Sequence, residues 1–271
     1  MKVYRTPLMY YDHIIRESPK PDEYPKHIHN EYEFLYFRRG NASLFINASV
    51  YKMNKRDLLF IPAGAYHYLL PSASSDAYER YCIHFSKKLL PKRFQEILQT
   101  LSNIYHIKKN SPIDLFFSSL ARFEYDDKYE DADITFFIEQ NLALLLTHLK
   151  YQQPNASIIP TETNNILNNI LDYIDENLTQ PITAELLSKI FYKSESWITH
   201  NFAKKLQIPL KKYINYKKII YAQELIEAGK QPTTVAEELS FENYVTFYRA
   251  YLRFLNKKPN EDTPTSSAVK Q

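Results

Sequence analysis

Two histidines and a glutamate stand close together in the stretch HIHNEYEFLYFRRG, which runs from His27 to Gly40. His27 and His29 are two residues apart, and Glu33 follows four residues after His29. Alternate side chains of a β-strand point to the same face, so all three side chains can point the same way. Imidazole and carboxylate groups bind iron, manganese, zinc or nickel, and they also hydrogen-bond to small polar molecules. The spacing therefore indicates either a metal site or the wall of a binding pocket.

A second segment, PAGAYH, ends in another histidine, His67. Proline and glycine favour turns, so we expect this segment to bring His67 to the mouth of the same pocket. Other histidines have no partner at ligand spacing, and we interpret them as surface or core residues: His13, His84, His106 and His148. No catalytic triad is legible, because order in sequence does not show proximity in space.

Short strands must position these residues. Five segments are rich in aromatic and branched residues and are separated by turn formers such as RRGN and PAGA: EFLYF, ASLFI, DLLFIP, HYLLP and YERYCIHF. Several short strands at close spacing, from about residue 24 to 86, predict a small barrel or sandwich.

Two amphipathic helices are predicted after the strands, in PKRFQEILQTLSNIYHIKK and ADITFFIEQNLALLLTHLK. The second, from about Ala132 to Lys150, has many apolar residues at helical spacing: Ile134, Phe137, Ile138, Leu142, Leu145 and Leu149. Either it packs on its own barrel, or it forms a subunit interface. Charging Leu142 or Leu145 would yield folded monomers in the second case and an unfolded protein in the first.

Composition limits the class of protein. Lys plus Arg outnumber Asp plus Glu by only 34 to 31, so any basic surface must be local. The single Cys82 cannot form an intramolecular disulfide, and the three glycines fit no nucleotide-binding pattern. The chain starts without the apolar run of a signal peptide and contains no apolar stretch of membrane-spanning length. We therefore expect a cytoplasmic protein with no membrane partner.

A polar segment with two prolines, YQQPNASIIPTET, is the expected linker at residues 151–163. A length of 271 residues is also more than one average domain. The predicted domains are thus residues 1–150 and residues 164–271, joined by this linker.

The second domain is predicted to consist of helices. Thr163 can cap its first helix, Thr183 begins a short one, and Ser194 can cap the next. A longer helix ends at Gly229, a plausible left-handed cap. The arrangement then recurs, with a short helix, a turn and a helix from Tyr244 to Leu255. A short helix, a tight turn and a second helix form the helix-turn-helix pattern, which therefore occurs twice.

The pattern of apolar residues predicts which side of each helix-turn-helix copy faces the core. Six side chains should face the core: Leu187, Ile198 and Phe202 in the first copy, and Val235, Phe247 and Tyr251 in the second. Between Leu186 and Lys218, eight lysines stand against a single acidic residue, Glu195: Lys189, Lys193, Lys204, Lys205, Lys211, Lys212, Lys217 and Lys218. A lysine run alone favours a solvated helix face, but beside two helix-turn-helix patterns it favours contact with DNA phosphates.

From Ile166 to about Pro259 the chain resembles the DNA-binding domain of the AraC family of bacterial transcription regulators. The segments that carry the resemblance are ILDYIDENLTQPITAELLSKI, SESWITHNFAKKLQIPLKKYI, AQELIEAGKQPTTVAEELSFENYVTFYRAYLRF and NKKP. The family pattern is met at Leu187, Ser188, Ser194, Phe202 and Lys204, and again at Val235, Ala236 and Phe241. Four positions depart from it: Gln207, Ser240 and Asn256 replace turn glycines, and Lys218 stands where arginine is frequent.

The resemblance implies two sets of DNA-binding residues. The first helix would use Ser196, Thr199, His200 and Lys204, and the second Asn243, Tyr244, Val245, Tyr248 and Arg249. Small or apolar groups suit thymine methyl groups, and Arg249 suits guanine or phosphate.

The N-terminal segments resemble the two signature segments of cupin barrels. The resemblance implies that His27, His29, Glu33 and His67 occupy the metal-ligand positions of the metallo-cupins. Arg56 stands where the second signature begins with glycine, and Pro71 stands where it ends with asparagine. Sensor domains of AraC-type regulators resemble cupins and commonly bind organic effectors without a metal. We therefore expect these four residues to bind an effector, with no metal and no cofactor.

The predicted fold class is α+β, with a cupin-like β-barrel and flanking helices followed by an all-α tandem helix-turn-helix domain. The predicted function is that of a transcription regulator, not an enzyme, which binds double-stranded DNA and a small-molecule effector such as a carbohydrate. A homodimer and contact with RNA polymerase are also expected. The alternative is a metal-dependent cupin enzyme with a helical assembly domain. The sequence does not name the effector, the promoter or the sign of regulation.

Overall fold

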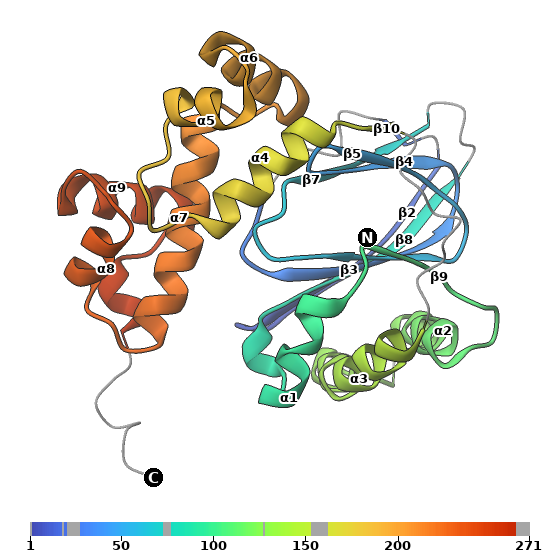
Figure 1. Ribbon diagram of the computed structural model, residues 1–271. Helices are drawn as coiled ribbons and strands as arrows, with labels where there is room; N and C mark the ends of the chain where they lie inside the picture. The colour runs from blue at the N-terminus through green and yellow to red at the C-terminus, as the bar shows by residue number, and fades with distance from the viewer. Residues whose placement is uncertain are drawn as a thin grey trace. The chain divides into compact units, whose positions relative to one another are not determined.

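The computed structural model describes residues 2–17, 19–20, 28–72, 77–126, 128–152 and 162–263. The chain divides into two compact units, residues 1–163 and 164–271 (Figure 1). His27 and most of the expected linker, residues 153–161, lie outside the described residues. Within the described part of the chain, no helix combines the length and hydropathy that crossing a membrane requires.

The first unit contains two antiparallel sheets. The larger has the strand order β1 (Lys2–Arg5), β2 (Met9–Arg16), β8 (Tyr78–Phe85), β3 (Tyr32–Arg39), β6 (Asp57–Ile61) and β9 (Ile104–His106). The smaller has the order β10 (Glu162–Thr163), β5 (Ser49–Met53), β4 (Ala42–Ile46) and β7 (His67–Pro71). All five strands expected from the sequence are present, and the predicted α+β class is confirmed. Among the described strands no ladder joins the two sheets, so they do not form one closed barrel.

Each face of the larger sheet is buried against a different layer. Because side chains alternate along a strand, β3 directs Phe34 and Tyr36 to one face and Leu35 and Phe37 to the other. The first pair packs in a core with residues of α2 (Pro112–Tyr125) and α3 (Asp131–Tyr151). The second pair packs against the smaller sheet. In Figure 1 the two helices accordingly lie along one face of the larger sheet.

Helix α3 belongs to the core of its own unit. Its buried residues are Ile134, Ile138, Leu142, Leu145, Leu146 and Leu149. Leu142 is 0% exposed and Leu145 is 3% exposed. The prediction that these two residues form a subunit interface is therefore wrong. The same helix leaves Phe136 and Leu144 exposed on its outer side.

The prediction of one amphipathic helix within residues 91–109 is also wrong. The segment instead forms the short helices α1 (Lys92–Gln95) and η3 (Ile97–Thr100), followed by strand β9, while η2 (Lys87–Leu89) precedes it. Strand β9 pairs with β6, and the Phe60 N–H donates to the Asn103 carbonyl at 2.8 Å. Pairing satisfies backbone groups at the edge of β6, and this tertiary contact overrides the local helical periodicity.

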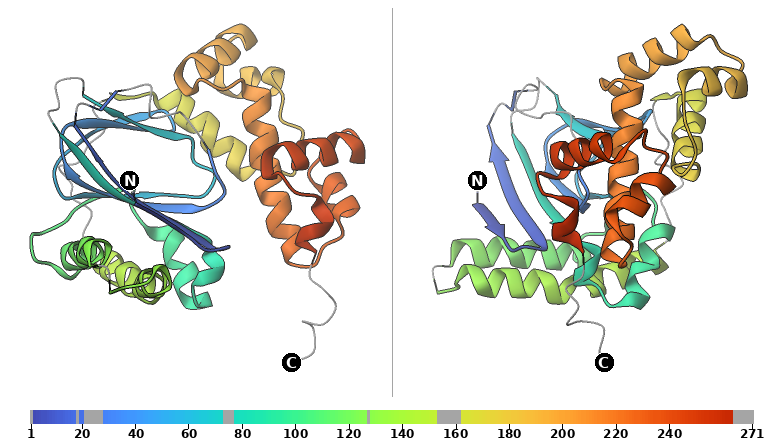
Figure 2. Two further views of the ribbon diagram at one scale, coloured as in Figure 1. Left: turned by 180° about the vertical axis from the view of Figure 1, so that it is seen from behind. Right: turned by 90° about the vertical axis from the view of Figure 1, so that its left-hand side faces the viewer.

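The second unit consists of helices: α4 (Asn165–Glu176), α5 (Ala184–Phe191), α6 (Glu195–Leu206), α7 (Leu210–Glu227), α8 (Pro232–Glu238), α9 (Tyr244–Leu255) and η4 (Pro259–Asp262). The side chains of Thr183 and Ser194 cap α5 and α6 as predicted. Asn164, not Thr163, caps α4, because its side chain accepts the Leu167 N–H. Both views in Figure 2 show α8 and α9 beside the C-terminal part of α7.

Four positions at which the resembled families have glycine carry another residue here, and the backbone at each of them is still left-handed. The φ angles are +69° at Arg56, +56° at Gln207, +54° at Ser240 and +53° at Asn256. Left-handed conformation is accessible to non-glycine residues at a cost that the surrounding structure must offset. These substitutions therefore change the side chain and preserve the turn.

Candidate functional site

The two signature segments of the first unit meet where β3, β7 and β8 approach one another. Glu33 of β3 lies directly opposite His84 of β8, so both side chains point between the sheets. His67 begins β7 of the smaller sheet. The Gly64 N–H donates to the His29 carbonyl at 2.8 Å, which ties the PAGAYH turn to the segment before β3. Gly64 has a φ of +75°, a conformation that glycine adopts without strain.

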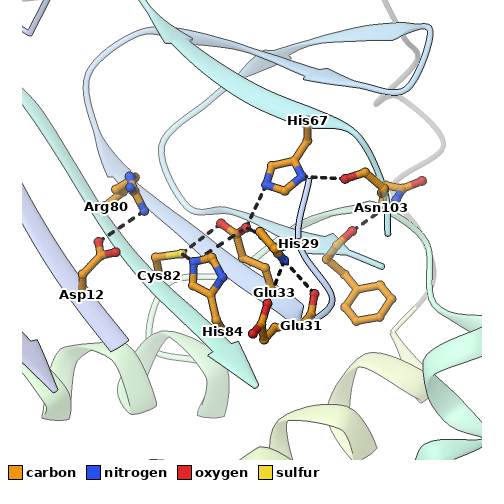
Figure 3. Close-up of polar contacts among 11 residues, drawn as sticks. Asp12, His29, Glu31, Glu33, His67, Arg80, Cys82, His84 and Asn103 are labelled. Atoms are coloured by element: carbon orange, nitrogen blue, oxygen red, sulfur yellow. Dashed lines mark hydrogen bonds and ion pairs between the residues drawn. The ribbon is translucent and has the colours of Figure 1, made fainter. Parts of the chain in front are cut away.

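The carboxylate of Glu33 is the centre of the resulting polar cluster (Figure 3). Its Oε2 lies 3.1 Å from His29 Nε2, 3.0 Å from His67 Nε2 and 3.9 Å from His84 Nε2. The Cys82 thiol donates to its Oε1 at 2.9 Å. Glu33 is only 3% exposed, so these neighbours replace the water that an ionised carboxylate requires.

Backbone carbonyls orient two of the imidazoles. His29 Nδ1 lies 2.9 Å from the Glu31 carbonyl, and His67 Nδ1 lies 3.0 Å from the Ala65 carbonyl. A carbonyl accepts hydrogen bonds only, so each Nδ1 is a donor and each Nε2 points to Glu33. Metal-binding histidines are held in the same way. The potential ligand atoms of His29, Glu33 and His67 lie within 4.8 Å of one another, so these residues fit a transition metal as well as a polar molecule.

Burial and mutual contact set the charges of the cluster. Burial would raise the pKa of Glu33, but the surrounding His84, His29 and His67 outweigh it and hold this pKa well below its usual range. Burial lowers the pKa of His84 to about 4, despite the nearby Glu33. Burial opposes the protonation of His29, but its hydrogen bond to Glu33 prevails and raises its pKa. The close contacts of the three imidazoles with the carboxylate thus favour its ionised form.

A surface hollow of about 600 Å³ gives access to the cluster. His29 and His84 form its wall on the cluster side, and residues 5–10, Glu31 and Ser86 form the rest. A molecule that enters the hollow therefore meets two imidazoles first, with the Glu33 carboxylate behind them.

The interpretation of the isolated histidines as surface or core residues overlooked His84, which joins the cluster. His13 is a buried core histidine whose Nδ1 lies 2.6 Å from Glu124, and the partly exposed His106 has its Nδ1 2.8 Å from Asp57. Their partners come from other strands or from α2, which ligand spacing along one segment does not reveal. A second group with metal-ligating side chains, Asp12, Cys82 and His84, adjoins the first. Only the register of β2, β8 and β3 brings these residues together.

Helix α6 exposes the residues that the sequence assigned to DNA. Ile198 and Phe202 are 0% exposed, whereas the assigned residues lie on the solvent side: Ser196, Thr199, His200 and Lys204. The Thr199 hydroxyl hydrogen-bonds to the Glu195 carbonyl at 2.9 Å, which directs the threonine side chain along the helix.

Helix α9 repeats this arrangement. Phe247 and Tyr251 are 0% exposed, while Tyr244, Val245 and Arg249 are exposed and Tyr248 is half-buried. Asn243 caps the helix, since its Oδ1 accepts the Thr246 N–H at 2.9 Å. This cap occupies the carboxamide oxygen and leaves the amide NH₂ as the group that Asn243 can offer to DNA.

The lysines divide into separate environments. Lys218 is 4% exposed and its ammonium binds backbone carbonyls, so its assignment to a phosphate-binding surface is wrong. Lys217 pairs with Asp175 at 2.9 Å, and Lys189 pairs with Glu185 at 2.6 Å. The remaining exposed lysines on α6 and the start of α7 are Lys204, Lys205, Lys211 and Lys212.

An α+β unit with an accessible polar pocket, followed by a tandem helix-turn-helix unit, is the architecture of a ligand-responsive transcription regulator. Residues 14–132 match the family model described as the AraC-like ligand binding domain. The chain is 24% identical over 245 residues to the uncharacterized HTH-type transcriptional regulator YdiP of Escherichia coli K12, covering 87% of this chain and 79% of the relative. It is 22% identical over 214 residues to YijO of the same organism, another uncharacterized HTH-type transcriptional regulator, covering 76% and 72%. Residues 14–132 therefore match AraC-like ligand binding domains, and the chain as a whole is similar to HTH-type transcriptional regulators.

The chain also matches a solved structure, unsaturated fatty acid bound wild-type ToxT from Vibrio cholerae strain SCE256. The match covers 100% of both chains at 12% identity, with a TM-score of 0.40. Similarity at this level carries no information about the ligand of this chain.

Proposed function

We propose that the second unit binds double-stranded DNA sequence-specifically through α6 and α9, under the control of an effector in the first unit. The observation that carries this proposal is the repeated surface of these two helices. Each buries large apolar side chains and exposes mainly polar or aromatic residues on one side. A recognition helix needs such a surface to contact base edges in the major groove.

The exposed residues have distinct proposed roles. Val245 and the methyl group of Thr199 contact thymine methyl groups, and Ser196 and His200 contact nearby base edges or phosphates. Lys204 and the amide group of Asn243 bind the sugar-phosphate backbone of the DNA, while Tyr244 and Tyr248 pack against the same backbone. Arg249 reads guanine, because a guanidinium can donate two hydrogen bonds to O6 and N7 of this base.

Genomic fragments selected by the purified full chain provide the direct test. The proposal expects recovered fragments to share one motif with two subsites about one helical turn apart. Recovery of fragments without a shared motif contradicts sequence-specific binding. Genes beside the selected fragments would also indicate the effector.

In the first unit, we propose that His29, Glu33 and His67 bind a small hydroxyl-rich effector such as a sugar. The sequence also assigned His27 to this set, and His84 is added because it lines the hollow. Imidazole N–H groups donate and the carboxylate accepts, so the pocket can pair with both parts of a hydroxyl group. No metal or other cofactor is required for this binding.

A bound transition metal is the second candidate, and the orientation of His29 and His67 by backbone carbonyls favours it. It would also suit the alternative of a metal-dependent enzyme, whereas we propose a regulator without catalytic activity. His29→Ala should abolish the reporter response to a sugar library while DNA affinity without effector stays nearly intact. His148→Ala on α3 is the matched control and should respond normally. Stoichiometric metal in protein purified without added metal, and lost in His29→Ala, would support the metal instead.

The remaining proposals concern assembly. Exposed apolar residues on the outer sides of α2 and α3, Leu115, Phe136 and Leu144, suit a homodimer interface. These exposed residues take the place of Leu142 and Leu145 in the predicted interface, because Leu142 and Leu145 are buried in the core. We further propose a cytoplasmic location, contact with RNA polymerase at the promoter and no membrane partner.

A further inference from the structure

Helix α7 connects the two helix-turn-helix motifs and carries a buried lysine near its middle. Its first half packs on the first motif, where the Tyr213 and Phe202 ring centroids are 5.3 Å apart. Its second half packs on the second motif, in a core that includes Ile219 and Ile226. Lys218 lies where these two halves meet and is only 4% exposed.

The Lys218 ammonium binds two backbone carbonyls, one from the turn before the first motif and one from within the second motif. Its Nζ donates to the Leu239 carbonyl at 2.6 Å, at the end of α8. It also donates to the Gln180 carbonyl at 3.1 Å, in the turn between α4 and α5. The Phe241 ring lies beside it, with its centroid 5.9 Å from Nζ. A buried ammonium needs acceptors in a fixed geometry, so this side chain joins the two turns.

Ser240 adds a second connection between the same two turns. Its hydroxyl donates to the Thr179 carbonyl at 2.8 Å. Ser240 has a φ of +54°, and the Phe241 N–H donates to the Ala236 carbonyl at 3.0 Å to complete the end of α8. Glycine would adopt this backbone more easily but has no hydroxyl to make the contact. Ser240 therefore supplies a hydrogen bond between the two turns that glycine at this position could not make.

We propose that Lys218 and Ser240 are positioning residues that fix α6 relative to α9 and thereby set the spacer length accepted between two DNA subsites. This inference rests on the proposed DNA-binding function. Two linked binding modules gain affinity when their separation matches the distance between their sites, and rigid linkage makes that match stringent. Loosening the connection should therefore lower affinity for the preferred spacer and broaden the range of spacers that bind.

Lys218→Met tests the proposal, because methionine fills the buried space without donating hydrogen bonds. For the full chain, affinity for the preferred site should fall about tenfold, while the penalty for lengthening the spacer shrinks to about threefold or less. Affinity for a single subsite should be unchanged. Lys218→Arg should restore most of the spacer preference, since a guanidinium can reach both carbonyls. Lys217→Met is the control, because Lys217 is the neighbouring lysine on α7 and its ammonium pairs with the Asp175 carboxylate of α4.

A measurement without DNA separates this inference from the proposed function. Spin labels at Lys205→Cys in α6 and Arg253→Cys in α9 report the distance between the motifs, and the native Cys82 is only 1% exposed to labelling. Pulsed electron resonance should give a narrow distance distribution that broadens in Lys218→Met but not in Lys217→Met. Unchanged distances and an unchanged spacer profile in Lys218→Met overturn the inference. If the unmodified chain binds no specific DNA, the function proposal fails, and the distance distributions still decide the role of Lys218.

Discussion

The two units differ in how far their functional side chains are exposed to solvent. In the first unit, Glu33 is 3% exposed and is contacted by three imidazoles and a thiol. In the second unit, Val245 is 56% exposed and Arg249 projects from the surface of α9. A small effector must enter a preformed polar pocket, whereas DNA is large enough to come to an exposed surface. Substitutions in the pocket should therefore affect both folding and response, and those on α9 should affect binding alone.

Helix α3 gives the largest expected effect, because it contains buried and exposed leucines side by side. Leu142→Asp places a carboxylate in the core and should destabilise the first unit by more than about 4 kcal/mol. Leu144→Asp changes a residue that is 51% exposed, so the unfolding free energy of the monomer, measured at a protein concentration below that of the proposed dimer, should stay within about 0.5 kcal/mol. Urea denaturation measures both. A folded Leu142→Asp monomer contradicts the assignment of this residue to the core.

The surface of α9 gives the next prediction. Arg249→Ala should weaken binding to the preferred site by about 1–3 kcal/mol and relax the base preference at one position. Its effect on the unfolding temperature should be small because the side chain is exposed. Competition binding against sequence variants measures the preference. An equal loss of affinity for every sequence makes Arg249 a phosphate contact.

The smallest predicted effect lies behind the pocket, between the larger sheet and α2. Burial opposes protonation of His13, but hydrogen bonds to Glu124 and Glu79 raise its pKa from 6.5 to about 8. Since the folded pKa is the higher, the protonated histidine stabilises the fold fully below about pH 6.5, and this contribution is lost as pH rises through 8. The loss should be about 1–2 kcal/mol.

Unfolding free energies measured from pH 6 to 9 check this assignment. His13→Gln should flatten the pH profile over this interval, because glutamine does not titrate. A variant profile that keeps the full slope means that other groups produce the dependence.

Local sequence patterns predicted the second unit better than the first. Ser194 and Thr183 marked their helices correctly because capping is a local interaction between residues close in sequence. Buried aromatics at helical spacing likewise identified Phe202 and Phe247 as core residues. Lys218 was misassigned because its acceptors lie 38 and 21 residues away in the sequence.

In the first unit, alternation correctly placed His29 and Glu33 together but gave no information about pairing between distant strands. His84 was missed because its contact with Glu33 depends on the register of β3 and β8. The helical periodicity before residue 109 was misleading because pairing of β9 with β6 decided the local structure. Metal or effector preference also depends on how His67 and His29 are oriented, which only the folded backbone determines.

Binding to a two-subsite DNA fragment tests the central claim most directly. The full chain is titrated against its selected site and against the same site with the spacer lengthened by about five base pairs, half a helical turn. Two recognition helices fixed in one unit predict a sharp loss of affinity, because one helix would face the wrong side of the duplex. Equal affinity for the two fragments would contradict recognition by both α6 and α9.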